Sequence, residues 1–238
     1  MTQAATIHPL VGSAPIGNWF IPDTTQRHPL GTILDYIDPF YGGGEAIYLQ
    51  APASVALEVG SVVVYSLTGP YIASLVANDA SQGGASLAFA LNAVASSASA
   101  QFFWAAIAGS TPVRAASDVA AGAALGIAGV GQAGAIAAGK QILSAESVGA
   151  FATTVVKTNV QTQSGSAVIK ASNADGWWVG MTMTGTGITG TITGIDADNR
   201  LVTLSANATA TGSVTVTGTF TNRIRVQHNR PMAQGQIV

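Results

Sequence analysis

The chain has 238 residues, which is enough for one large all-β domain with an appended lobe and a substantial core. Only 8% of the residues are charged and 48% are hydrophobic, which indicates a globular chain and excludes a solvated disordered polymer. The net charge of −2 argues against nucleic-acid binding, and the absence of cysteine excludes disulfides, thiolate zinc sites and cysteine nucleophiles.

Residues 1–45 are rich in proline, glycine and aromatic residues, as in "HPLVGSAPIGNWFIPD" and "DPFYGGGE". Proline fixes φ and removes a backbone donor, so neither a long helix nor a central strand is expected. The sequence therefore predicts an extended N-terminal arm outside the folded core. The first residues lack a basic start and an apolar run, so we expect cytoplasmic synthesis without export.

Residues 46–160 contain short apolar runs bounded by turn residues, which predict strands: "AIYLQ", "GSVVVYSLTG", "YIASLV", "AQFFWAAIAG" and "ATTVVKTNV". The run "SLAFALNAVASSASA" fits a helix or a strand. Residues 119–139 are uncharged, but their alanine and glycine content and Gln132 argue against a membrane span. Together with residues 220–238, which end in an alternating strand, this segment predicts a β-sandwich or β-barrel-like body.

Residues 161–219 differ in composition from the rest of the chain. They consist of threonine, glycine, valine and isoleucine in period-two pieces such as "MTMTGT", "TITGI", "LVTL" and "SVTVTGT". The pieces are separated by "SNADG" and "DADN" turns. The segment therefore predicts a small β lobe inserted before the last strand, and the whole chain is expected to be all-β.

Motifs that resemble catalytic sites fail on their context. The glycines of "GTGITG" precede a strand-like segment where a dinucleotide site needs a helix, and they predict a turn. In "GAIAAGKQ" a glutamine replaces the hydroxyl of a phosphate loop. "DADNR" lacks the glycine and glutamate of a calcium loop and predicts a hairpin turn. We therefore expect no enzyme, no catalytic residue, no metal site and no cofactor.

Trp177 and Trp178 are adjacent in the predicted lobe. In an extended strand, neighbouring side chains point to opposite faces. This predicts that Trp178 packs inside the lobe and that Trp177 covers the body or a neighbouring protomer. In the alternative, both lie in a loop after "NADG" and shield the open end of the lobe.

The order of several segments resembles the capsid decoration, or cement, proteins of tailed bacteriophages. The resemblance lies in "HPLGTILDYIDPFYGGGEAIYLQAPASVALEVGSVVVY", "AQFFWAAIAGSTPVRA", "DVAAGAAL", "AAGKQILSA" and "VQHNRP". These pieces cover roughly residues 28–157 and 221–232. Residues 161–219 depart from the pattern, and are themselves similar to small Thr/Gly-rich modules of phage surface and fibre proteins.

The resemblance implies a virion structural protein that binds the major capsid protein on the outer capsid surface, commonly as a homotrimer, and stabilises the shell. Synthesis is then expected in the host cytoplasm, with neither a nucleic acid nor a membrane as partner. The alternatives are a tail or fibre component with a host-binding lobe, and a lectin or carbohydrate-active protein. The aromatic residues expected at interfaces are Trp19, Phe20, Tyr36, Phe40, Tyr41, Trp177 and Trp178.

Overall fold

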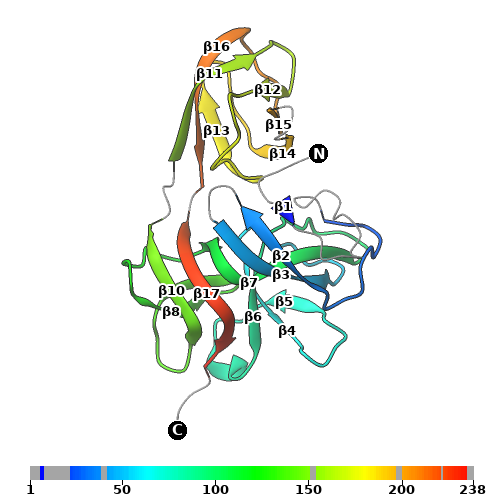
Figure 1. Ribbon diagram of the computed structural model, residues 1–238, viewed down its shortest axis with the longest axis vertical. Helices are drawn as coiled ribbons and strands as arrows, with labels where there is room; N and C mark the ends of the chain where they lie inside the picture. The colour runs from blue at the N-terminus through cyan, green and yellow to red at the C-terminus, as the bar shows by residue number, and fades with distance from the viewer. Residues whose placement is uncertain are drawn as a thin grey trace.

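The computed structural model describes residues 6–7, 22–38, 42–150, 154–196, 200–220 and 222–234. They form an almost entirely β protein, which confirms the all-β prediction. A single turn of 3₁₀ helix, Ala80–Gln82, is the only helical element in these ranges. Figure 1 shows a larger body with a smaller lobe at one of its ends. None of the described segments is a helix long and apolar enough to cross a membrane.

The body is one eleven-stranded antiparallel sheet, in the order β1-β2-β3-β7-β6-β17-β10-β8-β9, with β4 and β5 attached beside β6 (Figure 1). Its strands are β1 (Thr6–Ile7), β2 (Ile33–Asp38), β3 (Gly42–Ala51), β4 (Val62–Tyr65), β5 (Ala73–Leu75), β6 (Ser86–Ala90), β7 (Gln101–Arg114), β8 (Ala124–Gly129), β9 (Gln132–Ala135), β10 (Gln141–Ala150) and β17 (Arg223–Ala233).

The long strand β7 organises this sheet. Its first half pairs with β3 and, at Ala105 and Ala106, with β6, whereas its second half pairs with β17. A bridge between Ala115 and Ala133 then brings β9 back beside the end of β7. Strands β7, β17, β10, β8 and β9 therefore close into a barrel-like ring. The run "SLAFA", which fitted a helix or a strand, forms β6.

Both faces of the sheet around β3 and β7 are buried. Tyr48 and Trp104 belong to one hydrophobic cluster, and their sequence neighbours Leu49 and Phe103 belong to a second cluster. Adjacent residues of a strand point to opposite faces, so two covered faces need an uninterrupted apolar run. This explains why "FFWAAIA" shows no hydrophobic alternation.

The lobe is a second, six-stranded sheet in the order β13-β16-β11-β12-β15-β14. A bridge between Thr182 and Thr191 joins β13 to the start of β14, so the two end strands of the sheet meet and the lobe closes into a small barrel. Its strands are β11 (Thr154–Thr162), β12 (Val168–Lys170), β13 (Thr182–Gly185), β14 (Ile192–Asp196), β15 (Leu201–Leu204) and β16 (Gly212–Thr219).

The lobe is inserted between two neighbouring strands of the body. Strands β10 and β17 pair up to Ala150 and Ile224, and the first and last lobe residues, Thr154 and Thr219, are again register partners. The predicted start of the lobe at residue 161 is therefore wrong. The segment "TTVVKTNV" has ordinary strand chemistry, and only its pairing with β16 assigns it to the lobe.

The prediction that residues 1–45 form an arm outside the core is wrong for the part from residue 22 onward. Strand β2 lies within the sheet, paired with β3, and its Leu34 and Tyr36 are buried. The prolines at 29 and 39 flank this strand without interrupting it. Upstream, Asp23 bridges to Phe102 and accepts a hydrogen bond from the Tyr48 hydroxyl at 2.9 Å. Apart from the backbone of residues 6–7, the first 21 residues lie outside the described part, and their role as an arm stays a prediction.

Candidate interaction surface

The seven aromatic residues expected at interfaces do not form one surface. Trp19, Phe20, Phe40 and Tyr41 lie outside the described residues. Tyr36, Trp177 and Trp178 are at most 2% exposed. The interface role expected for these three is therefore wrong for this chain as folded, because none presents its ring on the outer surface.

The two tryptophans occupy a loop. The backbone N–H of Trp177 donates to the Ala174 carbonyl, and that of Met181 donates to the Trp178 carbonyl, which marks two successive turns. In this conformation, adjacent side chains need not point to opposite faces. The prediction based on an extended strand is wrong, and the alternative that places both residues in a loop after "NADG" agrees with the structure.

Trp177 lies inside the lobe, where the strand-based prediction had placed Trp178. Its indole N–H donates to the Val155 carbonyl of β11 at 3.1 Å. Its ring also lies against β16: a Cβ added to Gly218 would sit 2.9 Å from the indole nitrogen. The absence of a side chain at Gly218 therefore leaves the room that the Trp177 ring occupies against β16.

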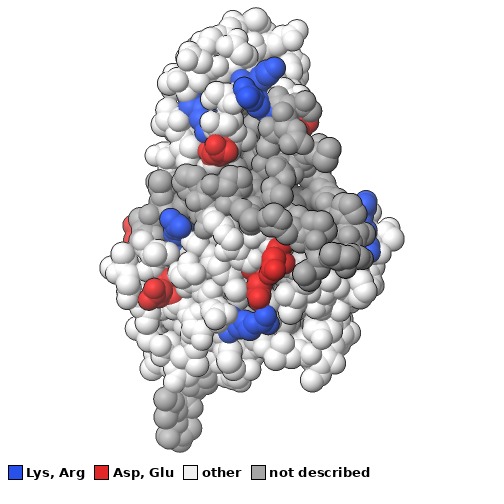
Figure 2. Space-filling view, in the orientation of Figure 1, with Lys and Arg blue, Asp and Glu red and all other residues white. Residues whose placement is uncertain are grey.

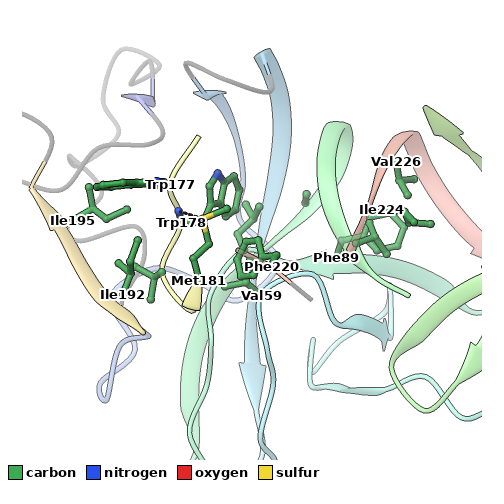
Figure 3. Packing of buried hydrophobic residues seen from close by; sticks show 14 of the residues in the cluster. Val59, Phe89, Trp177, Trp178, Met181, Ile192, Ile195, Phe220, Ile224 and Val226 are labelled. Carbon is green, nitrogen blue, oxygen red and sulfur yellow. Dashed lines mark hydrogen bonds between the residues drawn. The ribbon is translucent and has the colours of Figure 1, made fainter. Parts of the chain in front are cut away.

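Trp178 lies on the side of the lobe that faces the body. Figure 3 shows Trp177 beside Ile195, and Trp178 directed toward Met181, Phe220 and Val59. Val59 belongs to the body and Phe220 follows the last lobe strand, yet both belong to the same buried cluster as the two tryptophans. The hydrophobic core is therefore continuous across the junction of lobe and body.

A buried arginine adds polar contacts at the same junction. Arg223, 6% exposed, donates from Nε to the Val59 carbonyl at 2.9 Å and from Nη2 to Glu58 Oε2 at 2.8 Å. Arg114 contacts the other oxygen of Glu58 at 2.9 Å, and Phe220 packs against the Arg223 guanidinium. Burial lowers the pKa of Arg223, and Glu58 opposes that shift. These contacts fix the first residue of β17 beside the lobe.

The outer side of β11, β16 and β13 carries a regular set of threonines, which we call the threonine face. In register, Thr184 of β13 lies beside Thr217 of β16, which lies beside Val156 of β11, and the next row consists of threonines only. The face contains Thr154, Val156, Thr158, Thr182, Thr184, Thr215, Thr217 and Thr219. The alternation in "TMTGT" and "TVTGT" was its sequence signal, although it was interpreted only as strand chemistry.

Charged side chains are few and scattered on the face of the molecule in Figure 2. Several charged side chains of the molecule form ion pairs within the chain: Glu58 pairs with Arg114 and Arg223, and further pairs join Asp23 to Arg27 and Glu45 to Arg230. The three arginines of β17 have different partners: Arg223 pairs with Glu58, Arg230 pairs with Glu45, and Arg225 donates to the Ser110 hydroxyl. The threonine face itself contains no charged residue.

The body also contains a buried histidine beside an open groove. His228 is 3% exposed, its Nε2 lies 3.3 Å from the Thr111 hydroxyl, and Phe89 packs on its ring at 4.7 Å. Burial lowers the pKa of His228 to about 4, and a hydrogen bond with the Ile107 backbone opposes the shift. The groove has a volume of about 450 Å³, and its polar lining is Ser144, Glu146, Gln227 and Asn229.

Two of the motifs that resemble catalytic sites form turns. Gly187 and Gly190 of "GTGITG" have φ values of +70° and +107° in the connection from β13 to β14, as predicted for turn glycines. Strands β14 and β15 pair antiparallel around "DADN", which confirms the hairpin. Within the described ranges, no group of three histidine or acidic side chains is placed to hold a metal ion.

The chain was compared with protein-family models, with curated proteins and with solved structures, and none of them matches it. The features that describe the candidate surface are a charge-poor exterior and a threonine face. The lobe that carries this face is joined to the body by a continuous core.

Proposed function

We propose that the chain is a structural protein of a tailed-phage particle, which binds the outside of the capsid and stabilises the shell. The observation that carries this proposal is the charge-poor exterior, in which several of the few charges are already paired within the chain. Binding to another protein then requires little desolvation of unpaired charge, a step that costs several kcal/mol for each ion.

The distribution of the sequence resemblance supports the same proposal. Its segments, roughly residues 28–157 and 221–232, coincide largely with strands β2 to β10 and β17 of the body. The departing residues 161–219 lie within the lobe, whose ends are adjacent. In the proposed particle, the body contacts the major capsid protein as a homotrimer, and the lobe is an addition that leaves the body's contacts in place.

The test uses empty shells of the phage that encodes the chain, freed of this protein. The full chain should cosediment with the shells and raise the temperature at which they disrupt. A variant without residues 1–21 should bind more weakly, because the predicted arm is lost, whereas a variant without residues 154–219 should still bind. Light scattering of the free chain should report a trimer.

A cryo-electron reconstruction of the complete particle decides between the candidate locations. Density for the chain on the shell supports the proposal. Absence of binding to empty shells, together with density on the tail alone, overturns it in favour of a tail or fibre component.

A further inference from the structure

Lys157 occupies an inward position on β11. Its neighbours Val156 and Thr158 are exposed on the threonine face, whereas Lys157 lies on the opposite side of the strand. The Lys157 Nζ atom lies 5.6 Å from the centre of the Trp177 ring, which is fully buried. The lysine stem therefore runs along the lobe core and brings its amine to the edge of that core.

The Lys157 amine contacts the side-chain amide of Asn173. Lys157 Nζ lies 2.6 Å from Asn173 Oδ1, in the loop that follows β12. The same oxygen accepts a hydrogen bond from the backbone N–H of Asp175 at 3.2 Å. Burial lowers the pKa of Lys157, and the nearby Asp175 carboxylate opposes that shift. Burial thus increases the fraction of neutral amine, the nucleophilic form.

We propose that Lys157 and Asn173 join in an intramolecular amide cross-link within the lobe, a modification beyond the proposed function and independent of it. The Lys157 amine attacks Cγ of Asn173, a C–N bond forms to Nζ, and the bond from Cγ to Nδ2 breaks. The Lys157 ammonium and the Asn173 carboxamide become one secondary amide and one ammonium ion. The step is neither an oxidation nor a reduction, and it requires no co-reactant.

The surrounding groups have separate roles in this step. Asp175 accepts a proton from the Lys157 ammonium and returns it to the departing nitrogen. The Asp175 backbone N–H stabilises negative charge that develops on Asn173 Oδ1. The Trp177 ring holds the lysine stem, so amine and amide are already in contact before reaction. The link would tie β11 covalently to the loop that carries both tryptophans.

Intact mass spectrometry of the full chain tests the proposal. The expected mass is lower than the sequence mass by one ammonia, and trypsin should fail to cleave after Lys157. Peptide mapping should recover one branched peptide that contains both Lys157 and Asn173. This last result separates the cross-link from loss of ammonia by cyclisation of an asparagine alone.

Substitutions give the matched controls. Lys157→Arg keeps the positive charge over Trp177 but cannot be acylated, and Asn173→Ala removes the electrophile, so both should show the full sequence mass. Asp175→Asn should slow the loss of ammonia. Lys170→Arg, at the lobe's other and exposed lysine, should leave the loss of ammonia unchanged. Full sequence mass for the folded wild-type chain after prolonged incubation, with normal cleavage after Lys157, overturns the proposal whatever the variants do.

Discussion

The lobe and the body close their sheets in different ways. The lobe is a closed barrel in which β13, β14 and β15 follow one another in the chain. Its first and last strands in the chain, β11 and β16, pair with each other. The body closes only after β7 has met β17, more than a hundred residues later in the chain. The lobe is therefore held together by pairing within one continuous stretch of chain, whereas the body depends on pairing between distant stretches. The lobe should therefore be removable, whereas the body depends on contacts between distant segments.

Deleting the lobe at two different boundaries tests most directly whether the lobe is separable from the body. Replacing residues 154–219 by a short Gly/Ser linker should leave a folded body, because Thr154 and Thr219 are register partners and the gap is short. Replacing residues 161–219 should give an aggregating chain, because most of β11 stays behind without its partner β16. Size-exclusion chromatography and circular dichroism measure both. Equal behaviour of the two deletions would contradict the boundary.

Trp177→Ala sharpens the comparison from inside the lobe. Loss of a fully buried indole and of its hydrogen bond to Val155 should destabilise the lobe by ~3–5 kcal/mol. Hydrogen exchange should then accelerate at β11 and β16, while β3 and β7 keep their protection. Trp178→Ala is the paired variant, and it should also loosen the packing around Phe220. Accelerated exchange throughout the body of the Trp177 variant would show that the two parts unfold as one unit.

His228 provides a test that is confined to the body. Its pKa of about 4 in the folded chain lies below the ordinary value of 6.5, so the unfolded state binds more protons between these values. Stability from this group is complete above pH 6.5 and falls as the pH drops toward 4, by up to about 3 kcal/mol. Urea unfolding at several pH values measures the slope, and His228→Gln should flatten it. A slope that the substitution leaves unchanged would assign it to other groups.

The smallest expected effects come from two arginines on β17. Arg223→Ala removes a buried side chain with partners at Glu58 and Val59, and should cost about 1–3 kcal/mol. Arg230→Ala breaks an exposed pair with Glu45 and should cost about 0–1 kcal/mol. Thermal unfolding of both variants measures the difference. Equal losses of stability in the two variants would show that the contacts of Arg223 at the junction contribute no more than the exposed pair of Arg230.

The sequence predicted where strands form better than it predicted which strands pair with each other. Alternation in "MTMTGT" and "SVTVTGT" identified β13 and β16, because strand chemistry is local. The assignment of "TTVVKTNV" to the lobe was missed, because it depends on pairing with β16 across some fifty intervening residues. The burial of β2 was missed for a related reason. The flanking prolines indicate where a strand must end, whereas the burial of the strand depends on its pairing with β3 in the sheet.

The candidate surface was harder to predict than the fold. Aromatic content pointed to Trp177 and Trp178, but two turns bring both inward, and turn geometry is not evident from the adjacency of two tryptophans. The contact between Lys157 and Asn173 joins a strand to a loop and has no spacing signature. The scarcity of charge, in contrast, is a property of composition, and it is directly visible on the folded surface.

The insertion of the lobe between β10 and β17 has a mechanical consequence. These two strands are neighbours and run antiparallel, so a load applied to the lobe pulls both from the same end of the body. Such tension acts along β17 and tends to slide it past β7, with which it pairs from Arg223 to Asn229. Their backbone hydrogen bonds would carry that shear together instead of opening one by one. Drag or impact on the lobe would thus reach the body through the pairing of β17 with β7.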